Sequence, residues 1–257
     1  MENVILQRYF DEMNNCETVQ IFDYSLYISK LDEINVSSKC VINTLNQYSY
    51  TVAEKDHKFK TALIESDILL PDGIGIVGAV KLLKGITIKK IAGSDLHEHL
   101  LYQLSATGGR CFYLGSNEAT LINIQKHLAI DYPSIKMGFY SPPFKSTFSE
   151  DDNAVMIKNI NSFKPDVLFV GMTAPKQEKW VHEHKDKVDS IVICSIGAVF
   201  EFYAGNIKRP GQIWIDLGLE WFVRLLHEPR HTWKRYIYYG PIFVYRILKQ
   251  KIINIFK

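Results

Sequence analysis

The 257-residue sequence has few of the features that assign a protein to a class at once. Its four cysteines (Cys16, Cys40, Cys111 and Cys194) stand far apart without a Cys-x-x-Cys pair, so neither a disulfide framework nor a cysteine zinc site is indicated. No uncharged apolar run reaches the roughly 18 to 20 residues that span a bilayer. The first residues also lack the charged-then-apolar plan of a signal peptide. We therefore expect a cytoplasmic protein with buried free thiols.

Patterns that bind metals are also missing. His97-Glu98-His99 and His182-Glu183-His184 both fall in predicted helices, where residues two apart point about 200° away from each other, so neither histidine pair closes on one ion. The sequence has no His-Glu-x-x-His, and it has no Asp-x-Asp, the carboxylate pair that usually holds the metal of a sugar nucleotide. We expect no metal site and no cofactor.

Acidic residues are absent from the end of the chain. From Pro229 onward there is no Asp or Glu, while seven cationic residues are present: Arg230, Lys234, Arg235, Arg246, Lys249, Lys251 and Lys257. Since the whole chain carries a net charge of +2, the remainder carries −5. This asymmetry indicates an anionic surface or substrate near the C-terminus, with a solvated helix or an oligomer contact as the alternative.

Short apolar runs alternate with helical patterns over most of the chain, which predicts βαβ units and a parallel sheet. The expected fold is α/β, a Rossmann-like, mostly parallel sheet with flanking helices over residues 1–209, followed by a helical, basic and aromatic C-terminal appendage over residues 210–257. The start of the chain is expected to contain a strand at Val19 to Phe22 and a helix from Leu26 to Ile34.

Ligands bind outside the carboxyl ends of parallel strands. The residues that follow predicted strands, and are therefore expected at this edge, are Thr44, Asp72, Gly115, Ser116, Gly171 and Gly197. After the strand that ends at Leu114, Gly115-Ser116-Asn117 leads into a helix whose free amides favour a phosphate oxygen. An ordinary turn between strand and helix is the alternative.

Gly73-x-Gly75-x-x-Gly78 spells the fingerprint of dinucleotide-binding proteins. Its context argues against that function. Asp95 has about the right spacing for the acid that binds ribose, but it starts a helix instead of ending a strand, and Asp72 would put a negative charge beside the pyrophosphate. The other interpretation is that Asp72 itself carries the chemistry at a strand end.

Gln177 and Glu178 stand in the first turn of a helix that follows the strand ending near Gly171. A neutral amide beside a carboxylate at the ligand edge can bind a nucleobase or sugar hydroxyls. The alternative is that Glu178 stabilises the helix dipole.

Several stretches occur together, in order, over roughly residues 38–236. They are Asn43-Thr44-Leu45-Asn46, Pro71-Asp72-Gly73-Ile74-Gly75, Ala92-Gly93-Ser94-Asp95-Leu96, Tyr113-Leu114-Gly115-Ser116, Gly171 to Glu178, Gly197 to Gly205, Leu219-Glu220-Trp221, Arg224-Leu225-Leu226 and Glu228-Pro229-Arg230. In this set the sequence resembles the WecG/TagA/CpsF family of bacterial glycosyltransferases (glycosyltransferase family 26).

The resemblance implies an inverting, metal-independent transfer of a sugar from a UDP-sugar, such as UDP-N-acetylmannosamine or a related uronic acid or hexose donor. The acceptor would be an undecaprenyl-diphosphate-linked saccharide of bacterial cell-surface polysaccharide synthesis. The resemblance makes Asp72 the general base and Thr44 a residue that assists it. Residues expected to bind substrate are Asn46, Gly73, Lys90, Gly115, Ser116, Asn117, Gln177, Glu178 and Glu201.

Two of these positions depart from the family pattern. Lys90 stands where arginine is usual, so a bidentate grip on phosphate becomes a point charge, and Glu201 stands where aspartate is usual. The cations expected to contact membrane or acceptor are Arg224, Arg230, Lys234 and Arg235. The protein would lie at the inner face of the cell membrane, bound to its anionic surface, with a homo-oligomer left open and no nucleic acid as partner.

Two other functions compete with this interpretation. One is a nucleotide-dependent oxidoreductase that uses the glycine motif. The other is a non-enzymatic protein that binds a membrane or a nucleic acid through its basic C-terminal residues.

Overall fold

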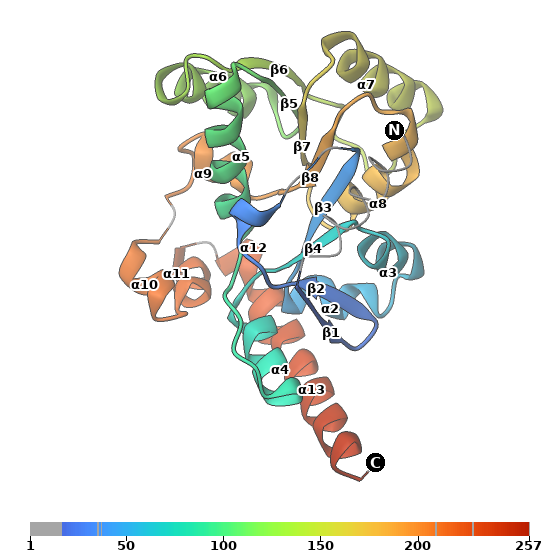
Figure 1. The fold of residues 1–257 in the computed structure, drawn as a ribbon, viewed down its shortest axis with the longest axis vertical. Helices are drawn as coiled ribbons and strands as arrows, with labels where there is room; N and C mark the ends of the chain where they lie inside the picture. Colours follow the sequence, from blue (N-terminus) through green and yellow to red (C-terminus); the bar gives the residue numbers. More distant parts are fainter. Residues whose placement is uncertain (1–16, 35, 37, 209, 228, 257) are drawn as a thin grey trace, which may run out of the picture.

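The computed structural model describes residues 17–34, 36, 38–208, 210–227 and 229–256. At its centre, six strands form one sheet in the order β4-β3-β8-β7-β5-β6 (Figure 1). Each neighbouring pair in this sheet is parallel. The strands are β3 (Cys40–Leu45), β4 (Ile68–Pro71), β5 (Arg110–Gly115), β6 (Lys136–Tyr140), β7 (Val167–Gly171) and β8 (Val192–Ser195). The predicted α/β class with a parallel sheet is confirmed.

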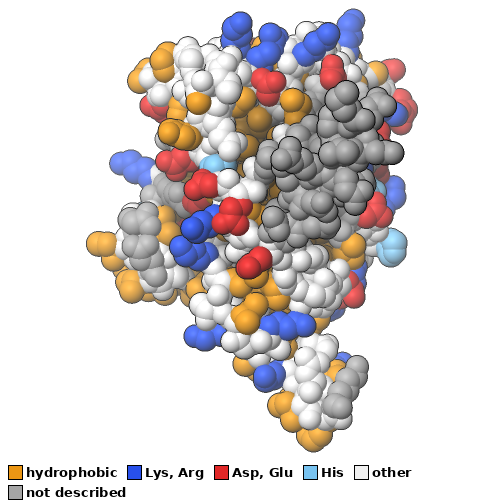
Figure 2. Space-filling model, in the orientation of Figure 1, with side chains coloured by type: hydrophobic (Ala, Val, Ile, Leu, Met, Phe, Trp, Pro, Cys, Tyr) orange, Lys and Arg blue, Asp and Glu red, His pale blue; other side chains and the backbone are white. Residues whose placement is uncertain are grey.

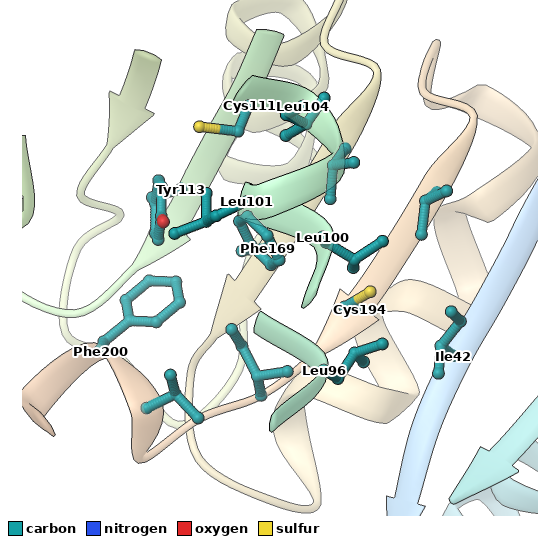
Figure 3. Close-up of a cluster of buried hydrophobic side chains, with 14 of the residues drawn as sticks. Ile42, Leu96, Leu100, Leu101, Leu104, Cys111, Tyr113, Phe169, Cys194 and Phe200 are labelled. Atoms are coloured by element: carbon teal, nitrogen blue, oxygen red, sulfur yellow. The ribbon is translucent and has the colours of Figure 1, made fainter. Parts of the chain in front are cut away.

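Helices cover both faces of the sheet, which is why strands such as β7 are buried along their whole length. On one face, α5 (Gly93–Thr107) and α6 (Glu118–Asp131) pack against the sheet. Figure 3 shows Leu96, Leu100, Leu101 and Leu104 of α5 beside Phe169 of β7. On the other face lie α7 (Glu150–Phe163) and α8 (Lys176–His184).

A further hydrophobic cluster lies where β3 and β4 form the edge of the sheet. Leu45 and Leu69 contribute to it together with α2 (Gln47–Ala53), α3 (His57–Ile64) and α4 (Ile74–Lys84). Phe243 and Ile247, from the last helix of the chain, are buried in the same cluster. The C-terminal appendage is therefore packed against the sheet domain at this edge.

The start of the described chain matches the prediction only in part. The strand expected at Val19 to Phe22 is confirmed as β1 (Thr18–Ile21), which forms a hairpin with β2 (Tyr24–Tyr27). The helix expected from Leu26 to Ile34 is absent: Leu26 and Tyr27 belong to β2, and the 3₁₀ turn η1 (Leu31–Glu33) follows. The predicted helix is wrong because Leu26 and Tyr27 pair with Val19 and Thr18 across the hairpin. Over Tyr24, Ser25 and Leu26 the burial alternates with the period of a strand, and Tyr27 is buried as well. Phe22 takes a positive φ of 52° in the turn of the hairpin.

The appendage is helical, as predicted. After α9 (Val199–Tyr203) come α10 (Gln212–Asp216), α11 (Glu220–His227), α12 (Pro229–Trp233), the π-helical segment η3 (Lys234–Tyr238) and α13 (Tyr239–Ile255). Figure 1 shows α13 running past α4 and extending away from the sheet. Gly218 joins α10 to α11 with a φ of 70°, and a Cβ there would lie 3.3 Å from Cγ1 of Ile74. This close approach places α10 and α11 against the start of α4.

Large apolar side chains are exposed along the appendage. In Figure 2 they gather over α10 and at the far end of α13. They include Ile213, Leu217, Leu226, Ile237, Leu248, Ile252, Ile255 and Phe256. Within the described ranges, no helix is both long enough and apolar enough to cross a bilayer.

The thiols of Cys40, Cys111 and Cys194 are buried, as predicted. Burial raises the pKa of Cys111 to about 12, so this thiol stays protonated and unreactive. Cys16 lies outside the described residues.

Candidate active site

Asp72 follows directly on β4, at the carboxyl end of the sheet. Its backbone N–H donates to the carbonyl of Leu45 over 2.9 Å, which continues the pairing of β4 with β3. Gly73 then turns the chain with a φ of 88° and begins α4. A Cβ at Gly75 would lie 3.1 Å from Oε1 of Gln47, so a glycine there lets the side chain of Gln47 lie close to the turn. Gly78 has open space around it.

A pocket of about 300 Å³ surrounds Asp72. One wall comes from α2, α4 and the segment before α5, and the other comes from the appendage. The lining residues are Asn46, Gln47, Tyr48, Asp72, Ile74, Val77, Ile88, Lys90, Ile215, Gly218, Glu220, Trp221, Arg224, Arg235 and Tyr236. The sequence predicted Asp72, Asn46, Lys90, Arg224 and Arg235 as site residues, and the fold brings these five together around one cavity.

The surroundings of Asp72 favour a carboxyl group that can exchange a proton near neutral pH. Desolvation raises the pKa of Asp72 to about 6, with the negative charge of Glu220 adding to the rise. Lys90 and Arg224 pull the pKa down, as does a hydrogen bond from Asn46. Asn46 is held in place because its Oδ1 caps α2, accepting from the N–H groups of Tyr48 and Ser49.

Three cations of the pocket occupy different positions. Lys90 donates to Oε2 of Glu220 over 2.8 Å, and both side chains are about one-fifth exposed. The guanidinium of Arg235 lies over the ring of Tyr48, 4.8 Å from its centre. Arg224 stacks over Phe202, and its Nε is buried without a hydrogen-bond partner. Arg230 and Lys234 were predicted, like Arg224 and Arg235, to contact the membrane or the acceptor. Both are exposed and lie outside the lining of the pocket.

A second group of predicted residues lies at the end of β5. Gly115 has a φ of 122°, and a Cβ there would meet the carbonyl oxygen of Gly171 at 2.3 Å, so only glycine is accommodated. Ser116 donates to Oε1 of Glu201 over 3.1 Å, and Asn206 donates to the other carboxylate oxygen over 2.7 Å. The side chain of Asn117 caps α6 by accepting from the N–H of Thr120.

Gln177 and Glu178 lie between these two groups in the sheet order, at the start of α8 after β7. Both are buried, and Nε2 of Gln177 donates to Oε1 of Glu178 over 2.9 Å. Burial raises the pKa of Glu178 to about 7, and its Oε2 is buried without a partner. The charge of Arg235 acts on Glu178, which connects this pair electrostatically to the Asp72 pocket.

The remaining predicted residue, Thr44, lies in β3 opposite Leu70. It is half-buried one residue before Leu45, and it lies outside the lining of the Asp72 pocket. Several lining residues were not predicted, among them Gln47, Tyr48, Glu220, Trp221 and Tyr236. Glu220 and Trp221 did stand in a stretch that carried the family resemblance, but that pattern gave no sign that they face Asp72.

β4 and β5 are four strands apart in the sheet, which at about 4.8 Å a strand separates their ends by roughly 19 Å. A ligand that contacts both Asp72 and Ser116 must therefore be elongated.

The structure also bears on the dinucleotide fingerprint. Asp95, the acid that this fingerprint would need at a strand end, lies in the first turn of α5, where its Oδ2 accepts from the N–H of Ala92. Among the described residues, no group of three or more His, Cys, Asp and Glu side chains is arranged to hold a metal ion.

Residues 18–255 match the model of the glycosyl transferase WecG/TagA/CpsF family. Among similar proteins is the N-acetylglucosaminyldiphosphoundecaprenol N-acetyl-beta-D-mannosaminyltransferase of Bacillus subtilis (strain 168), 30% identical over 227 residues that cover 88% of this chain and 86% of the Bacillus protein. A protein of the same name from Staphylococcus aureus (strain MW2) is 28% identical over 253 residues, covering 94% of this chain and 96% of its own. The match spans both the sheet and the appendage that closes the Asp72 pocket, and the chain therefore belongs to the WecG/TagA/CpsF family of glycosyltransferases.

Proposed function

We propose that the protein transfers a sugar from a UDP-sugar to a saccharide linked to undecaprenyl diphosphate, with inversion at the anomeric carbon and without a metal ion. The observation that carries the proposal is the carboxyl group of Asp72, held at the end of β4 with a pKa raised to about 6 in a pocket lined by cations. The names of the relatives support a mannosamine-type donor and a lipid-diphosphate acceptor.

Asp72 acts as the general base. An acceptor hydroxyl has a pKa far above 7, so its proton has to be removed as its oxygen attacks the anomeric carbon. In this step the oxygen forms a bond to the sugar, its proton passes to the Asp72 carboxylate, and the bond to UDP breaks with its electron pair leaving on the diphosphate. A pKa of about 6 leaves Asp72 mostly ionised at neutral pH and makes it a stronger base than an ordinary aspartate.

The leaving diphosphate needs positive charge. Lys90, Arg224 and Arg235 line the same pocket as Asp72 and would supply that charge in place of a metal. The unpartnered Nε of Arg224 is a donor that a phosphate oxygen would satisfy. Thr44, one residue from the strand end, is proposed to assist the reaction from β3.

The nucleotide end of the donor is proposed to extend along the sheet edge. Gly73, Gln177 and Glu178 lie on the way, and Gly115, Ser116, Asn117 and Glu201 lie at its far end. Buried Glu178 presents an unpartnered oxygen that can bind a hydroxyl or an amide of the donor. The hydrogen bonds that Glu201 accepts hold Ser116 and α9 together at this end.

The acceptor's lipid implies a membrane surface. Exposed apolar side chains on α10 and α13 would enter the interface, while Arg230 and Lys234 would contact anionic headgroups, each worth about 1 kcal/mol near the surface. The protein would then be a peripheral protein at the inner face of the cell membrane, with residues 210–257 as its membrane-facing part.

Transfer onto a short-chain lipid-diphosphate sugar tests the proposal, with UDP-N-acetylmannosamine as the first donor, EDTA present, and the anomeric configuration of the product read by NMR. Asp72→Asn should abolish transfer, by about a thousandfold or more, while leaving the affinity for UDP largely unchanged. Asp186→Asn is the matched control, because Asp186 is exposed on η2 (Lys185–Lys187), away from the pocket. Wild-type turnover by the Asp72 variant, or a product that retains the donor's configuration, would overturn the proposal.

A further inference from the structure

The ion pair between Lys90 and Glu220 connects two distant parts of the chain inside the Asp72 pocket. The residues are 130 positions apart, their side chains meet at 2.8 Å, and each is only about one-fifth exposed. Glu220 begins α11 of the appendage, whereas Lys90 belongs to the segment that leads into α5. Both line the cavity around Asp72.

Lys90 is fixed beside Asp72 by the backbone. The N–H of Ile91, the next residue, donates to the carbonyl of Pro71 over 3.0 Å, and Pro71 directly precedes Asp72. An ammonium group on a flexible stem at this position has two carboxylates within its surroundings, Asp72 and Glu220. In the structure it makes its hydrogen bond with Glu220.

Whether Lys90 pairs with Glu220 or with Asp72 affects how well Asp72 can act as a base. A lysine that paired directly with Asp72 would lower the pKa of that carboxyl and occupy the oxygen that has to accept the proton. The two partners act on Asp72 in opposite directions, since Lys90 lowers its pKa and Glu220 raises it. Other described groups act on Asp72 or line its pocket: Asn46 and Tyr48 at the start of α2, Arg224 of α11, and Arg235 and Tyr236 of η3.

We propose that Glu220 is a positioning residue for the transfer reaction, which holds the Lys90 ammonium away from Asp72 so that the carboxylate stays open to the acceptor hydroxyl. Because Glu220 comes from the appendage, Asp72 acquires this environment only when α11 lies over the pocket. When the diphosphate of the donor binds, Lys90 can replace its hydrogen bond to the Glu220 carboxylate by one to a phosphate oxygen. No ion pair between Lys90 and Asp72 has to be broken first. The inference rests on the proposed role of Asp72 as the base.

The test compares four proteins: the wild type, Glu220→Gln, Lys90→Met and the double variant. In Glu220→Gln, Lys90 is released to pair with Asp72, so the acid limb of kcat/KM against pH should move down by about one pH unit and kcat at neutral pH should fall several-fold. KM for the UDP-sugar should stay the same or fall, since Lys90 remains available for phosphate. Glu220→Asp should restore most of kcat because it keeps the charge.

The double variant distinguishes two effects of Glu220 on Asp72: the placement of Lys90, and the direct repulsion between the two carboxylates. In the Lys90→Met background, Glu220→Gln removes only the direct effect of its charge, so the downward shift should be clearly smaller than in the wild-type background. Glu183→Gln is the matched control, because it neutralises the acid of an exposed lysine pair, Lys58–Glu183, away from this pocket. Its pH profile should match that of the wild type.

A second readout does not depend on catalysis. The carboxyl ¹³C resonance of Asp72, assigned by its loss in Asp72→Asn, should titrate at lower pH in Glu220→Gln than in the wild type. If that titration does not move, or moves equally with and without Lys90, the positioning role is wrong even where transfer is active. If it moves as expected while no sugar is transferred by the wild type, the positioning stands and the proposed function fails.

Discussion

The sheet domain and the C-terminal appendage differ in where their apolar and charged side chains lie. In the sheet domain, strands such as β7 bury every residue, and Asp72 is the group that reaches a cavity from the end of β4. In the appendage, apolar side chains such as Leu217 and Ile252 face outward, while Glu220 and Arg224 point into that cavity. Besides the apolar face of α13 that packs on the sheet domain through Phe243 and Ile247, the appendage therefore has two further surfaces: one completes a polar pocket, and the other exposes apolar side chains.

No helix of the described residues is long and apolar enough to cross a membrane. The proposed function assigns contact with the membrane and its lipid-linked acceptor to the outer surface of the appendage. The proposed base, Asp72, belongs to the sheet domain, but the cations that face it come partly from the appendage, which is proposed to touch the membrane. The two tasks of the appendage should be separable by mutation.

The largest effect is expected at the inner surface. Arg224→Ala removes a guanidinium that lines the pocket and has a donor without a hydrogen-bond partner. Because the leaving diphosphate would then lose a positive charge that stabilises it, kcat should fall about a hundredfold or more. Binding to anionic vesicles should change little. A flotation assay alongside the transfer assay measures both, and equal losses in the two would mean that the surfaces are not separate.

The outer surface should show the reverse pattern. Leu248 and Ile252 lie four residues apart on one face of α13, and Phe256 follows as the residue that caps its C-terminal end; the three side chains are 50%, 55% and 84% exposed. Replacing all three by Gln should weaken vesicle binding by about a hundredfold, because each loses apolar area that would enter the interface. Transfer to a water-soluble, short-chain acceptor should persist, and its loss would contradict the division of tasks.

The ionised carboxylate of Asp72 should lower the free energy of unfolding, so replacing Asp72 by a neutral residue should raise it. The pKa of Asp72 in the folded protein is raised from 3.8 to about 6, so the ionised form is disfavoured by folding. The penalty is absent below pH 3.8, grows between the two pKa values and is complete above pH 6. Asp72→Asn should therefore unfold with a free energy about 3 kcal/mol higher at pH 7.5, and the gain should vanish near pH 4. Denaturant unfolding at both pH values checks this; a loss of stability at pH 7.5 would contradict the raised pKa.

A smaller effect is expected at the joint between the two regions. Gly218 has a φ of 70° and lies close to Ile74, so Gly218→Ala introduces backbone strain and a contact of 3.3 Å. Stability should fall by about 1 kcal/mol. Kcat should fall with it if α11 has to lie against α4 for activity. Gly211→Ala is the control, since a Cβ there meets open space.

The sequence predicted the parallel sheet because its strands and helices alternate with clear periods, and it placed Asp72 correctly at a strand end. It failed from Leu26 onward, because the four residues of β2 (Tyr-Ser-Leu-Tyr) are too few for their apolar pattern to distinguish a strand from a helix. No helix was expected at α2, whose N-terminus is capped by the side chain of Asn46.

The position of a candidate site residue was predictable where it depends on the residue's own strand end, as for Asp72 and Ser116. It was not predictable where it depends on contact between distant segments. No local pattern reveals that Glu220 meets Lys90, that Arg235 lies over Tyr48, or that Arg230 faces solvent while Arg224 faces the pocket. Those contacts follow from the way the appendage packs against α2 and α4.

The most direct test of the account is the pH dependence of kcat/KM for sugar transfer by the wild-type protein. Asp72 has to be ionised to accept the proton of the acceptor, so the rate should rise with pH, pass its midpoint near pH 6 and reach a plateau above pH 7. The residual rate of Asp72→Asn should show no such limb. A wild-type profile that stays flat from pH 7 down to pH 4.5, or a limb near pH 6 that survives in Asp72→Asn, would contradict the role of Asp72 as the base.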